Sequence, residues 1–352
     1  MSQDNSITAM YYAPLDVNEY ADYVRRTVEH YQNKIGFFDV WNEPWHPGFF
    51  SIGVTTTRPA NLDRAAAIAG GLGWYLNSET APEDFMKLQK AAYDTVKKIN
   101  PNLKISGLNS QGGSGKDGRY DGDEWSRRMV AAGALKALDV AGYHEYTGKA
   151  LGFRGDAVTE GHDRAIKPLG DAKVDIWLTE GSPVARATTS GFYNHTLPYK
   201  DGENVWLSAD RIVRFEVRLL SENVKRMFLY SMDAAATFGQ GRRARLMVNE
   251  DGYPHPMGAS QSALAWNLED TKFRSFMDLA ASKSGAAVFD GAETSVIVLM
   301  PGQEIPVPKT AGAAVQIEDI FGNEMKGART ATSIFIRGLR SEIDRIIPEL
   351  GK

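Results

Sequence analysis

An α/β fold built on a parallel sheet is the architecture that this sequence predicts. From residue 7 to residue 269, strand-like apolar runs alternate with helix-like segments without a change of rhythm. The strand-like runs are too apolar for one solvated face, which is typical of parallel strands covered by helices on both sides. Polar and aromatic residues gather directly after these runs, as they do at the carboxyl ends of such strands. The three observations favour a (β/α)8 barrel of the TIM type or a doubly wound sheet.

The elements follow in order along the chain. Strands are expected at residues 7–12, 37–43, 103–109, 140–146, 174–180 and 227–232. Helices are expected at residues 16–31, 123–138, 157–167, 208–223 and 257–269, and between Thr80 and Pro101. In that last helix, Thr80-Ala81-Pro82-Glu83 predicts a capping box with an early proline.

A second pattern begins after Phe273. Short β-prone runs are separated by turn sequences, which are Asp290-Gly291, Pro301-Gly302 and Phe321-Gly322-Asn323. This pattern predicts a small antiparallel β domain, closed by an amphipathic helix over residues 339–350. We therefore expect a barrel domain at 1–273 and a β-sandwich-like accessory domain with a C-terminal helix at 274–352.

The composition excludes several classes of function. The 352 residues include no cysteine, so neither disulfides nor thiolate metal sites are available. With 40 basic and 44 acidic residues, the net charge of -4 gives no reason to expect nucleic acid or an anionic membrane as a partner. No apolar run is long enough to span a bilayer, and residues 1–5 are polar rather than a signal peptide. A cytoplasmic location follows if Met1 is the native start; otherwise the compartment stays open.

The chemistry is expected at the end of the strand Phe37-Phe38-Asp39-Val40-Trp41-Asn42-Glu43-Pro44. An aromatic and β-branched run ends there in an amide, a carboxyl and a proline that stops sheet pairing. An amide and a carboxyl at the end of a buried strand must be solvated, hydrogen-bonded to a partner or involved in binding or catalysis. Glu180 ends the third strand after this one, in the sequence Ile176-Trp177-Leu178-Thr179-Glu180-Gly181.

These two motifs resemble those of the clan A glycoside hydrolases, which are retaining enzymes on (β/α)8 barrels. In that clan one catalytic glutamate ends strand four and the other ends strand seven, and the spacing in strands agrees here. Within the clan the chain is most similar to the family of β-xylosidases and α-L-iduronidases (family 39), because a small β domain also follows the barrel.

The resemblance implies roles for individual residues. Glu43 is the expected acid/base and Glu180 the expected nucleophile, with the pKa of Glu43 raised by its neighbours. Asn42 is expected to hold the sugar 2-hydroxyl, while His144 and Tyr146 are expected to orient Glu180. Glu145 is a reserve candidate for a catalytic carboxylate. The other substrate contacts expected at strand ends are Trp45, His46, Asn109 and Tyr230. No metal or organic cofactor is expected, and the expected partner is an oligo- or polysaccharide substrate.

The barrel is expected to be incomplete at its N-terminal side: the chain is a fragment of a longer enzyme, another chain supplies the missing strands, or the sheet is rearranged. A (β/α)8 barrel uses about 30 residues per unit, so roughly 90 residues should precede its fourth strand. Only 36 precede Phe37. The strand at 7–12 would then be the third, and the first two strands are missing. A second copy of the chain, as a homo-oligomer, is one candidate for covering the open side.

Two alternatives to a retaining glycosidase stay open. The first is a non-catalytic carbohydrate-binding or interaction protein derived from a truncated glycosidase barrel. The second is a doubly wound enzyme of unrelated chemistry, although no glycine-rich phosphate loop or Gly-x-Ser-x-Gly elbow follows any strand. Arg242, Arg243 and Arg245 could meet a carboxylated sugar, but a solvated loop is the simpler interpretation.

Overall fold

The fold is known from a computed structural model. It describes residues 12–55, 74–115, 119–146, 156–183, 205–230, 254, 256–279, 283–308, 314–325 and 327–350. The chain divides into two compact units. The first comprises Met1–Glu145, Glu160–Gly181 and Lys225–Phe228, and the second comprises Tyr146–Thr159, Ser182–Val224 and Leu229–Lys352. We describe each unit by itself.

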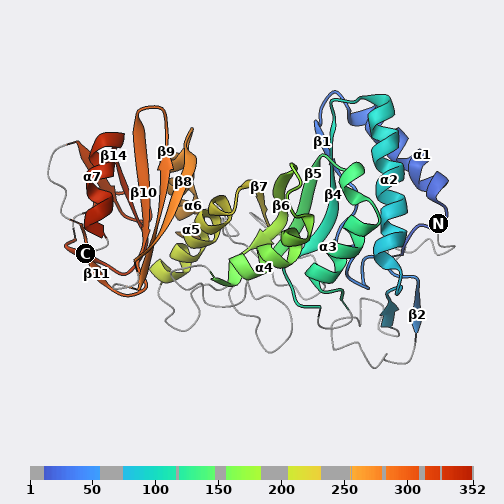
Figure 1. The fold of residues 1–352 in the computed structure, drawn as a ribbon, viewed down its shortest axis with the longest axis horizontal. Helices are drawn as coiled ribbons and strands as arrows, with labels where there is room; N and C mark the ends of the chain where they lie inside the picture. The colour runs from blue at the N-terminus through green and yellow to red at the C-terminus, as the bar shows by residue number, and fades with distance from the viewer. Residues whose placement is uncertain are drawn as a thin grey trace. The chain divides into compact units, whose positions relative to one another are not determined.

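A five-stranded sheet forms the centre of the first unit, in the order β1-β4-β5-β6-β7. The strands are β1 (Phe37–Asp39), β4 (Lys104–Gln111), β5 (Val140–Tyr146), β6 (Asp175–Ser182) and β7 (Val224–Leu229). The β1/β4 and β4/β5 pairs are parallel, as the apolar runs predict. Helices α1 (Val17–Tyr31), α2 (Ala81–Ile99) and α3 (Gly122–Ala131) alternate with these strands in sequence (Figure 1).

The sheet is curled. The rings of Phe37 on edge strand β1 and Phe228 on the opposite edge strand β7 stack with their centroids 6.1 Å apart. Trp177 on β6 contacts both rings, at 4.7 Å from Phe37 and 6.0 Å from Phe228. Residues on the two edges of a flat sheet could not meet in this way, so the five strands form a half-barrel with an aromatic layer on the inner face.

The helices form for the reasons that the sequence suggested, with one correction. Helix α2 buries Phe85, Leu88 and Val96 along one face. The capping box predicted at its start is wrong, because the Thr80 hydroxyl donates to Asp84 instead of accepting from a backbone N–H of the first turn.

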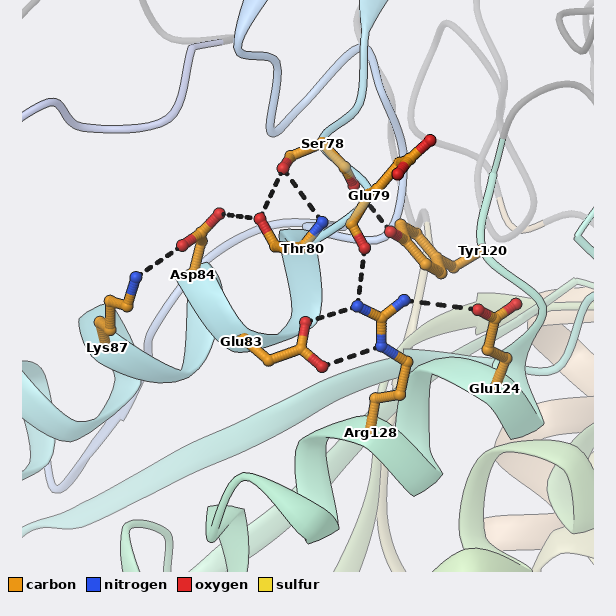
Figure 2. A network of polar contacts seen from close by, with 9 residues as sticks. All are labelled: Ser78, Glu79, Thr80, Glu83, Asp84, Lys87, Tyr120, Glu124 and Arg128. Carbon is orange, nitrogen blue, oxygen red and sulfur yellow. Dashed lines mark hydrogen bonds and ion pairs between the residues drawn. The ribbon is translucent and has the colours of Figure 1, made fainter.

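Glu83, the expected partner in that capping box, is used elsewhere. Its carboxylate accepts two hydrogen bonds from Arg128 of α3, at 2.9 and 2.6 Å (Figure 2). The same guanidinium donates to the carbonyl of Glu79 at 2.6 Å and lies over the ring of Tyr120. This network joins the start of α2 to α3 and to Tyr120, which precedes α3.

The second unit contains an antiparallel five-stranded sheet in the order β12-β14-β10-β9-β8. Its strands are β8 (Lys272–Leu279), β9 (Ser284–Asp290), β10 (Thr294–Met300), β12 (Val315–Glu318) and β14 (Ile334–Leu339). One face packs with helices α5 (Val205–Ser221) and α6 (Pro256–Leu268), and the other packs with α7 (Arg340–Leu350). Helices cover both faces of this five-stranded sheet, and the expected β-sandwich-like domain stays a prediction. The boundary at residue 273 stays a prediction.

Some expected helices and strands agree with the structure, and some short strands were not expected. The helix expected at 157–167 is α4 (Asp156–Ile166). The strand expected at 7–12 lies outside the described residues except for Tyr12, which forms a parallel bridge with Ser51. Short strands β2 (Gly53–Thr55) and β3 (Trp74–Leu76) form a hairpin where the sequence suggested only a loop, and β11 (Ile305–Pro306) pairs with β13 (Arg329–Thr330). Within the described ranges, no helix is long and apolar enough to cross a membrane.

Candidate active site

The chain leaves strand β1 through a constrained turn. The hydroxyl of Tyr20 on α1 donates to the carbonyl of Val40 at 2.8 Å, directly after the strand. Glu43 then has a φ of 45°, which is uncommon for a residue with a side chain. The N–H of His46 donates to the carbonyl of Glu43 at 2.9 Å and closes the turn. Backbone strain of this kind persists where the surrounding structure holds it, often at functional sites.

Three strand ends bring Glu43, His144 and Glu180 together. The Nδ1 of His144 on β5 lies 3.0 Å from Oε1 of Glu43 and 3.9 Å from Oε1 of Glu180 on β6. One oxygen from each carboxylate and this nitrogen all lie within 4.8 Å of one another. The side chains of Glu43 and Glu180 keep 14% and 26% of their surface exposed, while His144 keeps 5%. The carboxylates are thus accessible to a ligand, and the histidine between them is enclosed.

Charge is matched between Glu43 and His144. Burial acts to raise the pKa of Glu43, but the hydrogen bond and charge of His144, with His46 and Arg119, outweigh it and lower the pKa. Burial acts to lower the pKa of His144, and the hydrogen bond and charge of Glu43, with Glu180 and Asp39, reverse this and raise it. The expected raised pKa of Glu43 is therefore wrong for the free chain, because both shifts favour the charged forms of the pair.

A bulge in β4 supports the same end of the sheet. Leu108 and Asn109 have φ values of 68° and 43°, and the register with β5 shifts between Gly107 and Ser110. The bulge turns the buried Asn109 side chain toward β1, where its amide donates to Asp39 at 2.6 Å and to the carbonyl of Trp41. Asn109 thus braces the strand that carries Glu43, and its expected contact with substrate stays a prediction.

Trp45 and His46 are buried in the turn after Glu43. The N–H of Gly48 donates to Nδ1 of His46 at 2.8 Å. Burial lowers the pKa of His46 to about 4, and the charge of Arg119 adds to this effect against that of Glu43. His46 is therefore neutral near pH 7. Both residues lie next to Glu43 in the turn, and their expected contact with substrate stays a prediction.

The remaining expected site residues are placed as follows. Asn42 is exposed beside Glu43. Tyr146 ends β5 and Tyr230 follows β7, but both belong to the second compact unit, so their expected roles stay predictions. The three arginines at 242, 243 and 245 lie outside the described residues.

Glu145, the reserve carboxylate, points away from this site. A Cβ built on Gly112 would lie 1.5 Å from its Oε2, and one on Gly161 would lie 1.9 Å from the same atom. The Glu145 carboxyl thus occupies the space that side chains at these two positions would take. It is buried between a loop and helix α4, while His144 points to the opposite side, as alternation along a strand requires.

The same three side chains could also hold a metal ion. An imidazole and two carboxylates within 4.8 Å supply the ligand types that zinc accepts. However, the hydrogen bond between His144 and Glu43 already matches their charges, and a metal would have to displace that proton. The expectation that no metal is needed stays a prediction.

Two residues near the site were not anticipated from the sequence. Asp39 points toward Asn109 from β1, and a signal for it was present, because Asp39 and Trp41 share one face of a strand with period two. Arg119 lies over the ring of Trp45, with its guanidinium carbon 5.9 Å from the ring centroid. It stands in the segment after β4, and nothing in its sequence context points to the turn after β1.

Solved structures with a similar fold include several glycoside hydrolases. A family 39 glycoside hydrolase from Bacteroides cellulosilyticus aligns with 93% of this chain and 63% of its own, at a TM-score of 0.59 and 15% identity. A glucosidase from Croceicoccus marinus aligns at a TM-score of 0.54 and 14% identity, covering 95% of this chain and 77% of its own. A monomeric beta-xylosidase from Caulobacter crescentus aligns at a TM-score of 0.53 and 15% identity, covering 93% of this chain and 75% of its own.

These likenesses establish the fold, not the activity, because the identities are low. The resemblance to clan A glycoside hydrolases is confirmed at that level: the neighbours belong to families 39 and 30. The chain spans about 63% of the length of the family 39 structure. No protein-family model matches the sequence, and no curated protein sequence matches it.

Proposed function

We propose that this chain is a retaining glycoside hydrolase that cleaves O-glycosidic bonds with Glu43 and Glu180. The observation that carries the proposal is that one oxygen of Glu43, in the turn after β1, lies within 4.8 Å of one oxygen of Glu180, near the end of β6. Retaining enzymes place their carboxyl groups about 5 to 5.5 Å apart, whereas inverting enzymes need about 6.5 to 9.5 Å to admit a water. The separation supports retention.

Each carboxylate then has a role. Glu180, the more exposed of the two, attacks the anomeric carbon while the bond to the leaving oxygen breaks and Glu43 gives that oxygen a proton. A covalent glycosyl ester on Glu180 results. Water then attacks the same carbon, the ester bond to Glu180 breaks, and Glu43 takes up the water proton, so the sugar leaves with its original configuration. Exposed Asn42, next to Glu43, is available to the sugar 2-hydroxyl.

His144 supplies the proton that the first step needs. In the free chain the proton lies on the His144 side of the pair, because the pKa of Glu43 is lowered and that of His144 is raised. Nδ1 and Oε1 are 3.0 Å apart, so the proton reaches Glu43 without any movement of the side chains. A bound sugar that excludes water strengthens the effect of burial on Glu43 and favours its neutral form.

The test is the configuration of the first product. Aryl β-xylosides are the first substrates to try, since one neighbour is a beta-xylosidase. Proton NMR during the first minutes of hydrolysis should show the β-anomer before mutarotation. Initial release of the α-anomer from the wild-type chain would refute the role of Glu180 as nucleophile.

A second candidate function is non-catalytic glycan binding. The observations that favour it are the share of the family 39 structure that this chain spans and the position of β1 at one end of the sheet in the described residues. Calorimetry that shows glycan binding, with no hydrolysis of any aryl glycoside, would favour this function. A homo-oligomer covering the β1 side is a related proposal, and light scattering that gives the mass of one chain would contradict it.

A further inference from the structure

Arg119 is a cation beside the candidate site that has no carboxylate counter-ion among the residues the structure describes. No carboxylate in the described ranges forms an ion pair with it, and its Nε is buried without a hydrogen-bond acceptor there. The residue is partly buried rather than free in solvent. A partly desolvated guanidinium of this kind is costly unless an anion neutralises it.

The neighbouring charges do not fill this role. The charge of Arg119 contributes to the lowered pKa of Glu43, but the charge of Glu43 is already matched by the hydrogen bond with His144 at 3.0 Å. His46, which Arg119 also influences, is neutral near pH 7. The positive charge of Arg119 is therefore available to a ligand that enters the site.

The guanidinium is held in place from two sides. Its carbon lies 5.9 Å from the centroid of the Trp45 ring, and the N–H of the next residue, Tyr120, donates to the carbonyl of Trp45 at 3.2 Å. The Tyr120 hydroxyl donates to the carbonyl of Ser78 at 2.7 Å, within the network around Arg128 (Figure 2). Arg119 is thus fixed relative to the turn that carries Glu43.

Other polar atoms around Trp45 also lack partners among the described residues. The indole Nε1 of Trp45 is a buried donor without an acceptor, and Oδ1 of Asn77 is a buried acceptor without a donor. The other end of the Asn77 amide donates to the carbonyl of Trp45 at 3.2 Å, so the two residues are neighbours. Unpaired donors and an unpaired acceptor suit a ligand that carries both anionic oxygens and hydroxyls.

We propose that Arg119 binds an anionic group, a carboxylate or a sulfate, on the sugar substrate next to Glu43. The inference rests on the proposed function and names its substrate class, which is acidic rather than neutral glycans. A guanidinium matches both kinds of oxyanion through two parallel N–H donors, and the ring of Trp45 keeps its plane oriented. Since Glu43 protonates the leaving oxygen, the acidic sugar is expected on the leaving-group side of the bond.

The test uses matched pairs of ligands. Titration calorimetry on the full chain carrying Glu180→Gln compares oligogalacturonate with its methyl ester, and a sulfated galactan oligosaccharide with its desulfated form. The charged member of at least one pair should bind ten-fold or more tightly than its neutral partner. Which pair shows the difference identifies carboxylate or sulfate as the ligand.

Variants assign the preference to Arg119. Adding Arg119→Gln should abolish it, whereas Arg127→Gln should leave it unchanged, because Arg127 is an exposed arginine paired with Asp123 on α3. Thermal unfolding checks that each variant is folded. Equal or absent binding of the charged members, or a preference that survives Arg119→Gln, would overturn the inference.

The two proposals fail in different ways. A wild-type chain that hydrolyses neutral aryl glycosides and shows no preference for charged ligands keeps the proposed function and loses the inference. A chain that hydrolyses nothing but prefers acidic ligands through Arg119 keeps the inference as a binding property and loses the hydrolase.

Discussion

The two five-stranded sheets of this protein use their residues in opposite ways. The parallel sheet around β1, β5 and β6 ends in charged side chains, residues with positive φ and a neutral buried histidine. The antiparallel sheet buries apolar side chains on both faces. Consecutive residues of β9, such as Val288 and Phe289, point to opposite faces and belong to two separate apolar clusters. The first arrangement gathers charged and strained groups at the candidate site at a cost in stability, whereas the second contributes mainly to stability.

The largest expected effects come from one substitution in each sheet. Glu180→Gln should lower kcat on an aryl glycoside by at least about a thousandfold, which corresponds to about 4 kcal/mol of activation free energy. Its unfolding temperature should change little, because Glu180 is partly exposed. Phe289→Ala should cost about 3 to 5 kcal/mol of unfolding free energy through the cavity it leaves in a buried cluster. Enzyme assays and urea unfolding of both variants test this division, and near-normal turnover by Glu180→Gln would contradict it.

One polar residue in the second unit breaks this pattern. Glu216 on α5 is buried, its Oε1 has no hydrogen-bond partner in the described part of the chain, and burial raises the pKa of its carboxyl to about 8. A carboxyl whose pKa is raised on folding binds its proton more tightly in the folded chain. Below the ordinary pKa of a glutamate both states are protonated. Between that pH and about pH 8, unfolding releases the proton, so the contribution of Glu216 to stability is lost as pH rises.

This loss can be measured. Glu216→Gln keeps the shape of the neutral side chain, so its unfolding free energy should exceed that of the wild type by a few kcal/mol at pH 8.5 and differ little at pH 5. Thermal unfolding at both pH values gives the comparison, with Glu222→Gln near the end of the same helix as a control. An equal difference at both pH values would show that Glu216 does not titrate in this range.

The sequence was sufficient to predict that Glu43, His144 and Glu180 lie together, because its signals are local to strands. The strand expected at 37–43 is shorter, because β1 ends at Asp39, but the chain still carries Glu43 past the carboxyl edge of the sheet. Counting strands then identifies Glu180. Alternation also separates His144 from Glu145 on opposite sides of β5. These features depend on the two-residue alternation of side chains along a strand, which can be read directly from the sequence.

Features that depend on long-range contacts were not predictable. Arg119 reaches the turn of Trp45 because the segment after β4 bonds to that turn, and no pattern within either segment indicates the pairing. The lowered pKa of Glu43 depends on a hydrogen bond from a residue on another strand. Strand β8 (Lys272–Leu279) was not among the expected strands, and the register of its pairing with β9 shifts between Phe273 and Ser275.

The smallest expected effect concerns two helix starts in the parallel half of the molecule. Asp121 caps α3: its carboxylate accepts from the N–H groups of Asp123 and Glu124 at 2.8 and 3.3 Å. Thr80 holds the equivalent position before α2 but makes no such bond. Asp121→Ala should therefore cost about 1 kcal/mol of unfolding free energy, a typical N-cap loss, and Thr80→Ala clearly less. Chemical denaturation resolves the difference, and a Thr80→Ala variant that loses as much as Asp121→Ala would mean that the Thr80 to Asp84 hydrogen bond stabilises α2 as strongly as a cap.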